Sequence, residues 1–210
     1  LKAECPDQLL EVGEAVSPEF EATAMVMEAE RLPSCPTVMF GNITGSQFSM
    51  AANVLAHRPR LAWAFGTSEE RLVHEFKERI QQPVAPKVLG DAPFRENTFL
   101  DEAVDLGQLP ILTHFEQDGG PYITAGLVVA RDPQSGMSTV GFHRMQLKGP
   151  RRLGVSLHSR RRMFEYFRRA EEKGEPLEAA ICIGVPPLLS LGALTLPPAG
   201  TEKFALQGGL

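Results

Sequence analysis

Positive charge is concentrated in one stretch of an otherwise acidic chain. The window from Arg144 to Lys173 holds ten basic residues and three acidic ones, although the 210 residues together carry a formal net charge of −5. A local surplus of arginine on an acidic protein favours a phosphate or carboxylate ligand over a long polyanion. The alternative is a solvated helix face on which arginines pair with glutamates.

Arg144 is the first candidate within this window because it lies in an otherwise apolar segment, Ser138 to Leu147. A charge there is costly to bury unless it is paired. With a two-residue period, Arg144 shares a face with Val140 and Phe142. The alternative is a solvent-facing arginine on a hairpin. The sequence pattern alone therefore indicates no more than a local anion-binding site.

Other common catalytic patterns are missing from the sequence. None of the five histidines has the spacing that places two metal ligands on one helix face. The chain also lacks glycine-rich phosphate loops and a nucleophile elbow. Its three cysteines have no CxxC spacing, which argues against a disulfide framework or a zinc site. We expect Cys182, in an apolar strand, to be a buried and unreactive thiol.

Length and composition predict a globular protein of one large or two small domains. Hydrophobic residues make up 43% and charged residues 22% of the chain, enough to bury a core without covalent staples. No apolar run reaches the roughly 18 residues that a membrane span requires. The first residues do not resemble a signal peptide, so we expect a cytoplasmic protein.

The first half of the chain mixes helical and strand patterns. Its predicted elements are a helix over Leu9–Leu32 with Ser17-Pro18 as a start signal, a strand at Thr37–Phe40, a helix over Met50–Arg58 and an amphipathic helix over Ser68–Gln81. Three prolines in Gln82–Phe94 predict a connector. We therefore expect residues 1–92 to form a small N-terminal α/β domain.

The second half is rich in predicted strands. They cover Ile111–Thr113, Tyr122–Ala130, Ser138–Leu147 and Ala179–Ile183. The turn signal at Asp132–Gly136 predicts a hairpin between the second and third of these strands. One helix is predicted over Ser159–Glu172, with Met163, Phe164, Phe167 and Ala170 facing inward. Residues 93–210 are thus expected to form a β-rich domain.

A series of ordered motifs makes the second half more specific than its periodicity. The most distinctive are Asp105-Leu106, Leu109-Pro110-Ile111, His114, Asp118-Gly119-Gly120, Tyr122-Ile123-Thr124, Gly126, Asp132-Pro133, Gly136, Gly141, Arg144, Thr201-Glu202 and Gly208-Gly209-Leu210. On these motifs the chain resembles the UbiD family, which includes polyprenyl-hydroxybenzoate and ferulic acid decarboxylases. The resemblance covers the chain from about residue 9 to its last residue.

The resemblance implies a lyase that uses prenylated FMN, a modified flavin, to remove or add carbon dioxide without net redox change. The expected substrate is an aromatic or α,β-unsaturated carboxylic acid. In such an enzyme the flavin is the electron sink, and the protein orients the cofactor and tunes its electronics. For residues 93–210 it implies a split β-barrel like those of flavin-binding proteins.

The family also implies a metal-binding site for the flavin phosphate, usually holding manganese, often with a potassium ion nearby. Its ligands are an Asn on the hairpin strand, a later His and a Glu further on. His158 and Glu202 match the last two, whereas Thr139 occupies the Asn position. A hydroxyl is a poorer ligand than an amide oxygen for a hard cation, so we expect a water to complete the shell. His158 as a helix cap and Glu202 as a surface carboxylate are the alternatives.

Arg144 matches the family arginine that contacts the flavin ring and the substrate carboxylate, a role suited to a bidentate guanidinium. Thr139 and Arg144 would lie roughly 16 Å apart if extended at about 3.3 Å per residue, about the reach from a flavin's phosphate to its ring. Their odd spacing predicts a bulge or bend between them. The backbone of Gly141, Phe142 and His143 would then line the cofactor. The family has a small residue at His143, where a titratable ring could alter substrate preference.

Family members are more than twice as long as this chain. Their two active-site glutamates, one of which donates the proton, have no counterpart here, and neither does their C-terminal domain. We therefore expect a cofactor-site half that is inactive alone, either as a fragment or as one part of a split enzyme. Expected partners are a flavin prenyltransferase that supplies the cofactor, and a second copy or a complementary C-terminal subunit.

Two other functional classes compete with this interpretation. One is a non-catalytic binding or assembly subunit of a decarboxylase complex that has lost the flavin site, as Thr139 suggests. The other is an RNA-binding module, which rests only on the arginine-rich window and lacks surface aromatics in a recognised motif.

Overall fold

The computed structural model describes residues 4–158, 161–197 and 201–210. Contacts divide the chain into two compact units, each built from three separate segments. The first comprises Leu1–Leu61, Pro93–Ile123 and Met145–Gly154, and the second comprises Ala62–Ala92, Thr124–Arg144 and Val155–Leu210. Contact-based units differ in kind from sequence domains, so the boundary expected near residue 92 stays a prediction.

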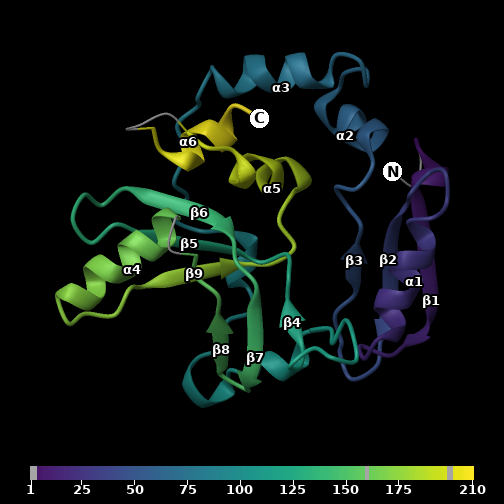
Figure 1. Ribbon diagram of the computed structural model, residues 1–210, viewed down its shortest axis with the longest axis horizontal. Helices are drawn as coiled ribbons and strands as arrows, with labels where there is room; N and C mark the ends of the chain where they lie inside the picture. The colour runs from purple at the N-terminus through teal and green to yellow at the C-terminus, as the bar shows by residue number, and fades with distance from the viewer. Residues whose placement is uncertain (1–3, 159–160, 198–200) are drawn as a thin grey trace. The chain divides into compact units, whose positions relative to one another are not determined.

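The first unit contains a three-stranded sheet in the order β1-β2-β3. Strands β1 (Leu9–Val16) and β2 (Thr37–Ile43) are parallel, and β3 (Met50–Ala52) pairs antiparallel with β2. Helix α1 (Glu21–Ala29) connects the two parallel strands (Figure 1), because a parallel pair needs a crossover. The core combines side chains of the helix and of this sheet, including Ala22, Ala29, Val38, Phe40 and Ile43.

Two helix predictions in this region are wrong. Residues 9–16 of the predicted helix Leu9–Leu32 form strand β1, and only part of the remainder is α1. Val12 and Val16, the buried residues of β1, are four apart, a spacing that fits both a helix face and a strand face. The predicted helix Met50–Arg58 is instead strand β3 and a loop, followed by α2 (Arg58–Phe65).

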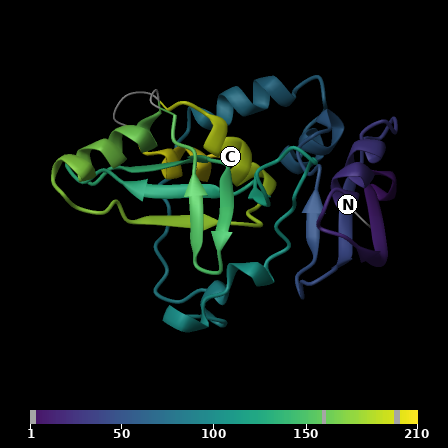
Figure 2. The same ribbon diagram turned by 60° about the horizontal axis from the view of Figure 1, so that its bottom comes forward.

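Short elements complete the first unit. They are four 3-10 turns, η1 (Pro6–Gln8), η2 (Pro93–Arg95), η3 (Asp101–Ala103) and η4 (Leu106–Gln108), and a sheet of β4 (Tyr122–Ile123), β7 (Met145–Gly149) and β8 (Arg152–Val155). Strand β7 pairs antiparallel with β4, as Figure 2 shows in green and teal. The expected strand at Ile111–Thr113 is reduced to single bridges at Leu112 and Thr113.

The second unit is organised around the predicted hairpin. Strands β5 (Leu127–Arg131) and β6 (Ser138–Phe142) pair antiparallel, and β9 (Ala179–Cys182) pairs with the other edge of β5. The turn at Asp132–Gly136 is therefore confirmed. Its local chemistry is sufficient, since Gly136 has a positive φ of 73° that suits glycine. Cys182 is a free thiol but is half-buried, rather than buried as expected.

Three of the helices that the structure describes pack against this sheet. Helix α4 (Arg162–Glu172) contacts β5 and β6, whereas α5 (Pro187–Leu194) and α6 (Lys203–Gly208) contact β6 (Figure 1). Helix α4 confirms most of the predicted helix, whose expected start at Ser159 lies outside the described residues. The inward positions are Met163, Tyr166 and Ala170, so the expectation for Phe167, which is exposed, is wrong. A spacing of 3.6 residues per turn fits Tyr166 and Phe167 equally well on the face of Met163 and Ala170, so the packing of the helix decides that the tyrosine is buried.

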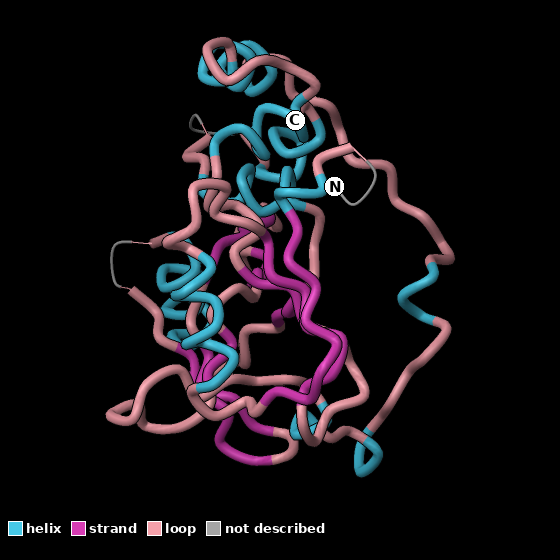
Figure 3. The backbone as a smooth tube through the Cα atoms, turned by 90° about the vertical axis from the view of Figure 1, so that its right-hand side faces the viewer, coloured by secondary structure: helices cyan, strands magenta, loops and turns pink. Residues whose placement is uncertain are grey.

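Helix α3 (Leu72–Ile80) confirms the predicted amphipathic helix, and the segment after it confirms the predicted connector. The last residues of the chain form hydrogen bonds with both. The connector runs as loop in Figure 3. The N–H of Val84 donates to the carbonyl of Ala205 at 2.8 Å, and Arg79 donates to the carbonyl of Leu210 at 2.9 Å. At Gly209 an added Cβ would lie 2.6 Å from the carbonyl oxygen of Gln82, so the close approach requires glycine.

The fold is therefore mixed α/β. In the described parts of the chain the strands form three separate three-stranded sheets and no closed barrel, and the split β-barrel stays a prediction. None of the described helices is long and apolar enough to cross a membrane.

Candidate functional site

Strand β6 carries the first group of predicted site residues. Its register with β5 is regular, with Thr139 opposite Ala130 and Gly141 opposite Val128. Because neighbouring residues of a strand point to opposite faces, Thr139 and Gly141 share one face of the sheet. Val140 of the other face packs in a core with residues of α5. Thr139 and Gly141 are both buried.

Glu202 lies at the beginning of β6. It is the N-cap residue of α6, and its Oε1 accepts a hydrogen bond from the backbone N–H of Ser138 at 3.3 Å. The carboxylate therefore lies beside the peptide that leads into Thr139. Burial is the main cause of the raised pKa of Tyr166 on α4, and the charges of Asp132 and Glu202 raise it further. Glu202 thus forms a hydrogen bond with β6 and interacts electrostatically with Tyr166 of α4.

His143 lies just beyond the end of β6 and is buried. Its Nδ1 is 3.4 Å from the carbonyl oxygen of Ser156, and its Nε2 would be 3.7 Å from a Cβ added at Gly141. The ring thus lies close to the Gly141 backbone. Burial lowers the pKa of His143, and Arg161, Lys203 and His158 lower it further, against the hydrogen bond to Ser156. These interactions favour a neutral ring.

Arg144 occupies the break between two sheets. Strand β6 ends at Phe142 and pairs with β5, whereas β7 begins at Met145 and pairs with β4. No bulge interrupts the β5–β6 register, and regular pairing ends before Arg144, so the bend expected between Thr139 and Arg144 stays a prediction. The carbonyl of Arg144 accepts from the N–H of Ser156 at 3.3 Å. Its side chain is exposed, which is compatible with a ligand-binding guanidinium.

The predicted site residues are connected only in part. Contacts in the described chain link Glu202 to the start of β6, and they link His143 to Gly141 and to the segment that leads to His158. They include no hydrogen bond or ion pair of the Arg144 side chain. The described residues contain no group of three His, Cys, Asp or Glu that could hold a metal ion. The expected ligand trio contains only two residues of those types, because Thr139 is the third.

Sequence reasoning did not single out Lys203, the first residue of α6. Its side chain is only 8% exposed, and Nζ donates to the carbonyl oxygens of Val140 at 2.8 Å and Ala193 at 2.7 Å. Burial lowers the pKa of Lys203, and the charges of Arg162 and Arg161 lower it further. The sequence signal was a single lysine beside a predicted metal ligand, which is too weak to indicate burial.

Arg162 begins α4 and belongs to the predicted basic window. Its Nη1 is buried and has no hydrogen-bond partner among the residues that the structure describes. A buried polar atom without a partner is unusual in a folded protein. Arg162 thus differs from the arginines further along the same helix.

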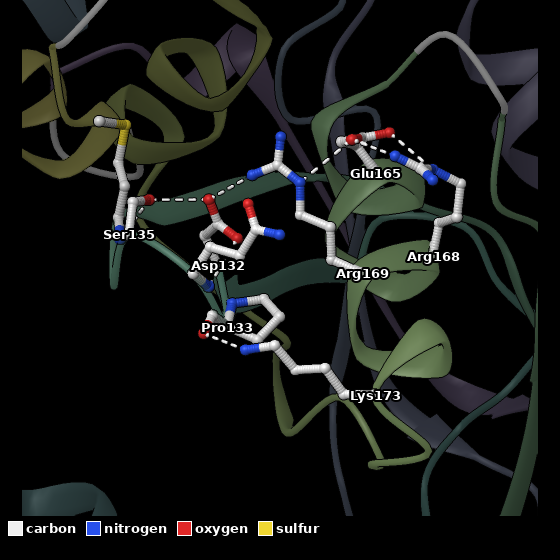
Figure 4. Close-up of polar contacts among 9 residues, drawn as sticks. Asp132, Pro133, Ser135, Glu165, Arg168, Arg169 and Lys173 are labelled. Atoms are coloured by element: carbon white, nitrogen blue, oxygen red, sulfur yellow. Dashed lines mark hydrogen bonds and ion pairs between the residues drawn. The ribbon is translucent and has the colours of Figure 1, made fainter.

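Those other arginines form a network of ion pairs (Figure 4). Arg169 donates to Asp132 at 2.6 Å and to Glu165 at 3.1 Å, and Arg168 donates to Glu165 at 2.8 Å. Arg168 also pairs with Glu172. The interpretation of the basic window as a helix face of arginine–glutamate pairs is therefore correct for this part of α4. Arg162 and its neighbours remain the candidates for an anion-binding site in this window.

Two cavities that the structure describes lie elsewhere, in the first compact unit. The larger, of about 550 Å³, is lined by residues of the segment from Phe94 to Phe99. The smaller, of about 170 Å³, lies between Phe48 and residues 99–109. Neither is lined by a predicted site residue.

Comparison with known families finds two matches that follow one another along the chain. Residues 2–80 match the 3-octaprenyl-4-hydroxybenzoate carboxy-lyase N-terminal domain. Residues 87–210 match the Rift-related domain of the same carboxy-lyase. All predicted site residues lie within the second match.

Relatives and solved structures agree with these matches. The chain is 32% identical over 198 residues to an anhydromevalonate phosphate decarboxylase of Methanothermobacter thermautotrophicus, covering 94% of this chain and 45% of the relative. It is 35% identical over 217 residues to a phenolic acid decarboxylase of a Streptomyces species, covering 97% and 45%. The chain thus spans about half the length of the curated relatives it matches. The solved structure of an evolved dimeric form of the UbiD-class enzyme HmfF from Pelotomaculum thermopropionicum, in complex with prFMN, superposes with a TM-score of 0.90 at 31% identity. It covers 99% of this chain and 48% of that one.

Proposed function

Because the chain belongs to the UbiD family of carboxy-lyases, we propose that it forms the cofactor-binding half of a non-oxidative decarboxylase. The substrate class is an aromatic or α,β-unsaturated carboxylic acid, and the reaction is reversible loss of carbon dioxide. The relatives named above are decarboxylases, and the HmfF structure contains prFMN. The chain covers under half of each relative, so activity is proposed for the assembly in which it takes part.

One observation carries the proposal. The carboxylate of Glu202 lies against the N–H of Ser138, next to Thr139, and His143, just beyond the end of β6, lies close to Gly141 of that strand. Glu202 and Ser138, which are 64 residues apart in sequence, thus meet at the start of β6, which leads toward Arg144. This is the arrangement that a phosphate at one end of the strand and a ring system at the other would require.

The residues at the start of β6 fit the phosphate end of a flavin. Buried Nη1 of Arg162 lacks a partner in the described chain, and an anion would satisfy it. Thr139, His158 and Glu202 would hold a divalent ion such as manganese, with oxygen donors from Thr139 and Glu202 that suit a hard cation and a ring nitrogen from His158. Prenylated FMN, when bound, supplies the electron sink for decarboxylation.

The remaining side chains would bind and orient the substrate. The exposed guanidinium of Arg144 can bind a carboxylate through two parallel hydrogen bonds. His143, whose pKa is lowered by burial and neighbouring cations, would present a neutral ring beside the backbone of Gly141 and Phe142. A neutral ring does not compete with Arg144 for the carboxylate.

The chain alone would lack the family's two active-site glutamates, including the proton donor, and would be inactive. A complementary C-terminal half or subunit would complete the active site. The HmfF structure is a dimeric form, which supports assembly of two copies. A flavin prenyltransferase would supply the cofactor in the cytoplasm. We also propose that residues 1–92 and 93–210 are the two domains, the second with split-barrel topology.

Co-expression with a flavin prenyltransferase tests the proposal. The purified chain should carry a chromophore with visible absorption, and the same preparation should release no carbon dioxide from phenolic or unsaturated acids. Sustained release by the chain alone would contradict the half-site. Absence of any bound flavin after co-expression, and after FMN addition with manganese, would contradict the cofactor assignment.

Thr139 at the Asn position of the family favours one competing function, a binding or assembly subunit without flavin. That alternative predicts a colourless protein in the same experiment. It also predicts that adding this chain to a complementary catalytic subunit changes assembly but not the bound cofactor.

A further inference from the structure

Two cationic groups in the second compact unit, the ammonium of Lys203 and Nη1 of half-buried Arg162, are buried with no anionic partner among the described residues. Among the residues that the structure describes, Lys203 Nζ donates to the neutral carbonyl oxygens of Val140 and Ala193 and to no carboxylate. Nη1 of Arg162 is buried and has no partner among the described residues. Neither side chain forms an ion pair with a carboxylate in this part of the chain. Burying unpaired charge is costly, and a bound anion would offset the cost.

The two cations belong to one cluster. Lys203 begins α6 and Arg162 begins α4, and both helices pack against β6. The charge of Arg162 acts on Lys203 and, after burial, is the largest influence that lowers its pKa. Mutual repulsion between fixed cations is destabilising unless an anion lies between or beside them.

The rest of the basic helix does not share this property. Arg168 and Arg169 pair with Glu165, and Arg169 also pairs with buried Asp132. The carboxylates of α4 therefore neutralise its middle and its end, while its first residue, Arg162, has no ion pair with any carboxylate that the structure describes. The unpaired charge is on the side of the helix start, where backbone N–H groups also favour an anion.

Building on the flavin-binding function proposed above, we propose that Arg162 and Lys203 form a fixed cationic pair for the phosphate end of FMN. This pair retains the phosphate when no divalent ion is bound. Arg162 donates through Nη1, and a guanidinium matches the geometry of a phosphate. Lys203 contributes its charge and the third of its three N–H donors, the other two being used by Val140 and Ala193.

Lys203 also has a structural role that the experiment must separate. It satisfies a carbonyl of edge strand β6 and a carbonyl in the last turn of α5, which lacks a partner within the helix. Loss of this support would weaken binding of any flavin. Loss of phosphate recognition would weaken FMN but not riboflavin, which has the same ring system without phosphate.

Flavin fluorescence quenching by the full 210-residue chain provides the test. Titrations with FMN and riboflavin are carried out in EDTA and again with manganese. We expect the unmodified chain to bind FMN at least tenfold more tightly than riboflavin in EDTA. Arg162→Met should weaken FMN binding about tenfold and change riboflavin binding less than twofold. Lys203→Met also removes two hydrogen bonds to backbone carbonyls, so it should weaken binding of both flavins but lower the FMN-to-riboflavin affinity ratio about tenfold.

Matched substitutions outside the cluster provide the controls. Lys173→Met removes an exposed lysine that donates to the carbonyl of Pro133, and Arg168→Met removes an arginine paired on the helix surface. Both should leave the FMN-to-riboflavin ratio unchanged. Lys203→Arg retains the charge and should restore part of the FMN preference. Equal affinities for FMN and riboflavin in the unmodified chain, or an unchanged ratio in Arg162→Met, would overturn the proposal.

Inorganic phosphate separates this inference from the flavin assignment. Phosphate titration followed by ³¹P line broadening should show binding to the unmodified chain and to Lys173→Met, and at least tenfold weaker binding to Arg162→Met. That result would support the cationic pair even if no flavin bound. No phosphate binding by the unmodified chain would overturn the pair, whereas flavin binding that does not depend on Arg162 would leave the decarboxylase function in place.

Discussion

Arg169 donates a 2.6 Å hydrogen bond to the buried carboxylate of Asp132, 37 residues away in sequence. The contact joins α4 to the turn between β5 and β6 (Figure 4). Asp132 also accepts from Ser135 Oγ at 2.7 Å and from the N–H of Gln134 at 3.1 Å. One carboxylate therefore fixes both the turn and the helix that covers it.

Asp132→Asn should destabilise the protein by about 1–3 kcal/mol, because it removes the charge that Arg169 faces and one acceptor of the turn. Urea unfolding followed by circular dichroism measures the change. Glu165→Gln, at a more exposed position on α4, is the control and should cost less than the Asp132 substitution. Equal effects of the two changes would contradict the special role of the buried carboxylate.

Asp132 also predicts a pH dependence of stability. Its burial raises the pKa, but hydrogen bonds from Ser135 and Gln134 and the charge of Arg169 together outweigh burial, so the pKa is lowered. A lowered folded-state pKa stabilises the fold above the unfolded value of about 3.9. This contribution is lost as the pH falls through the folded-state pKa. The difference in unfolding free energy between the unmodified chain and Asp132→Asn should therefore shrink on acidification from pH 6 to pH 3.

Arg60 holds several backbone carbonyls of the first compact unit. It is only 4% exposed and donates to the carbonyl oxygens of Val54 at 2.9 Å, Asn53 at 2.6 Å and Cys35 at 3.1 Å. Lysine has three donors at a single point and cannot reproduce this fork. Arg60→Lys should thus cost about 1–3 kcal/mol of unfolding free energy.

The matched control for Arg60 is Arg31→Lys. Arg31 is exposed just after the end of α1 and pairs with Glu28 of that helix, and such surface pairs contribute little, about 0–1 kcal/mol. Chemical unfolding of the two variants should therefore give clearly different midpoints. A midpoint for Arg60→Lys within error of that for Arg31→Lys would show that its hydrogen bonds are replaceable.

Gly209→Ala should destabilise the packing of the chain end against the α3 region. The new Cβ would meet the carbonyl oxygens of Gln82 at 2.6 Å and Arg79 at 2.7 Å, and backbone atoms cannot move aside as a flexible side chain can. We expect a cost of about 1–3 kcal/mol, as for other overpacked sites. Gly174→Ala is not a suitable control because its φ is 70°. Gly13→Ala, which has no atom within 4 Å of the added Cβ, is suitable and should be milder in thermal unfolding.

Thr139→Asn tests the proposed metal site directly. An amide oxygen is a better ligand than a hydroxyl for a hard cation, so manganese affinity should rise by about tenfold. Glu202→Gln should lower it. Electron paramagnetic resonance of free manganese during titration measures both, and circular dichroism confirms that each variant folds. A manganese affinity that both substitutions leave unchanged would show that Thr139 and Glu202 are not metal ligands.

Local patterns were sufficient where the chemistry is local. The turn at Asp132–Gly136 contains its own hydrogen-bond acceptor and its own glycine, so the hairpin was predictable. The same holds for the amphipathic helix that precedes the connector. The family was predictable as well, because its motifs follow one another in a fixed order along the chain.

Tertiary structure decided whether a segment is a helix or a strand where its apolar pattern fits the period of both. Val12 and Val16 suit a helix or a strand equally, and only pairing with the distant strand β2 makes the segment a strand. Likewise, ten basic residues in one window do not reveal which are neutralised. Arg169 pairs with Asp132, in a turn 37 residues away in sequence, whereas Arg162 pairs with no carboxylate among the described residues.

The sequence by itself determined the family, the hairpin and the types of residue available for an anion site, because these depend on local order along the chain. Only the tertiary structure decided that Lys203 is buried against β6 and α5 and that Glu202 meets Ser138. The physical reason is that burial and charge pairing depend on which distant segments pack together. A single lysine or glutamate carries no local signal of its eventual neighbours.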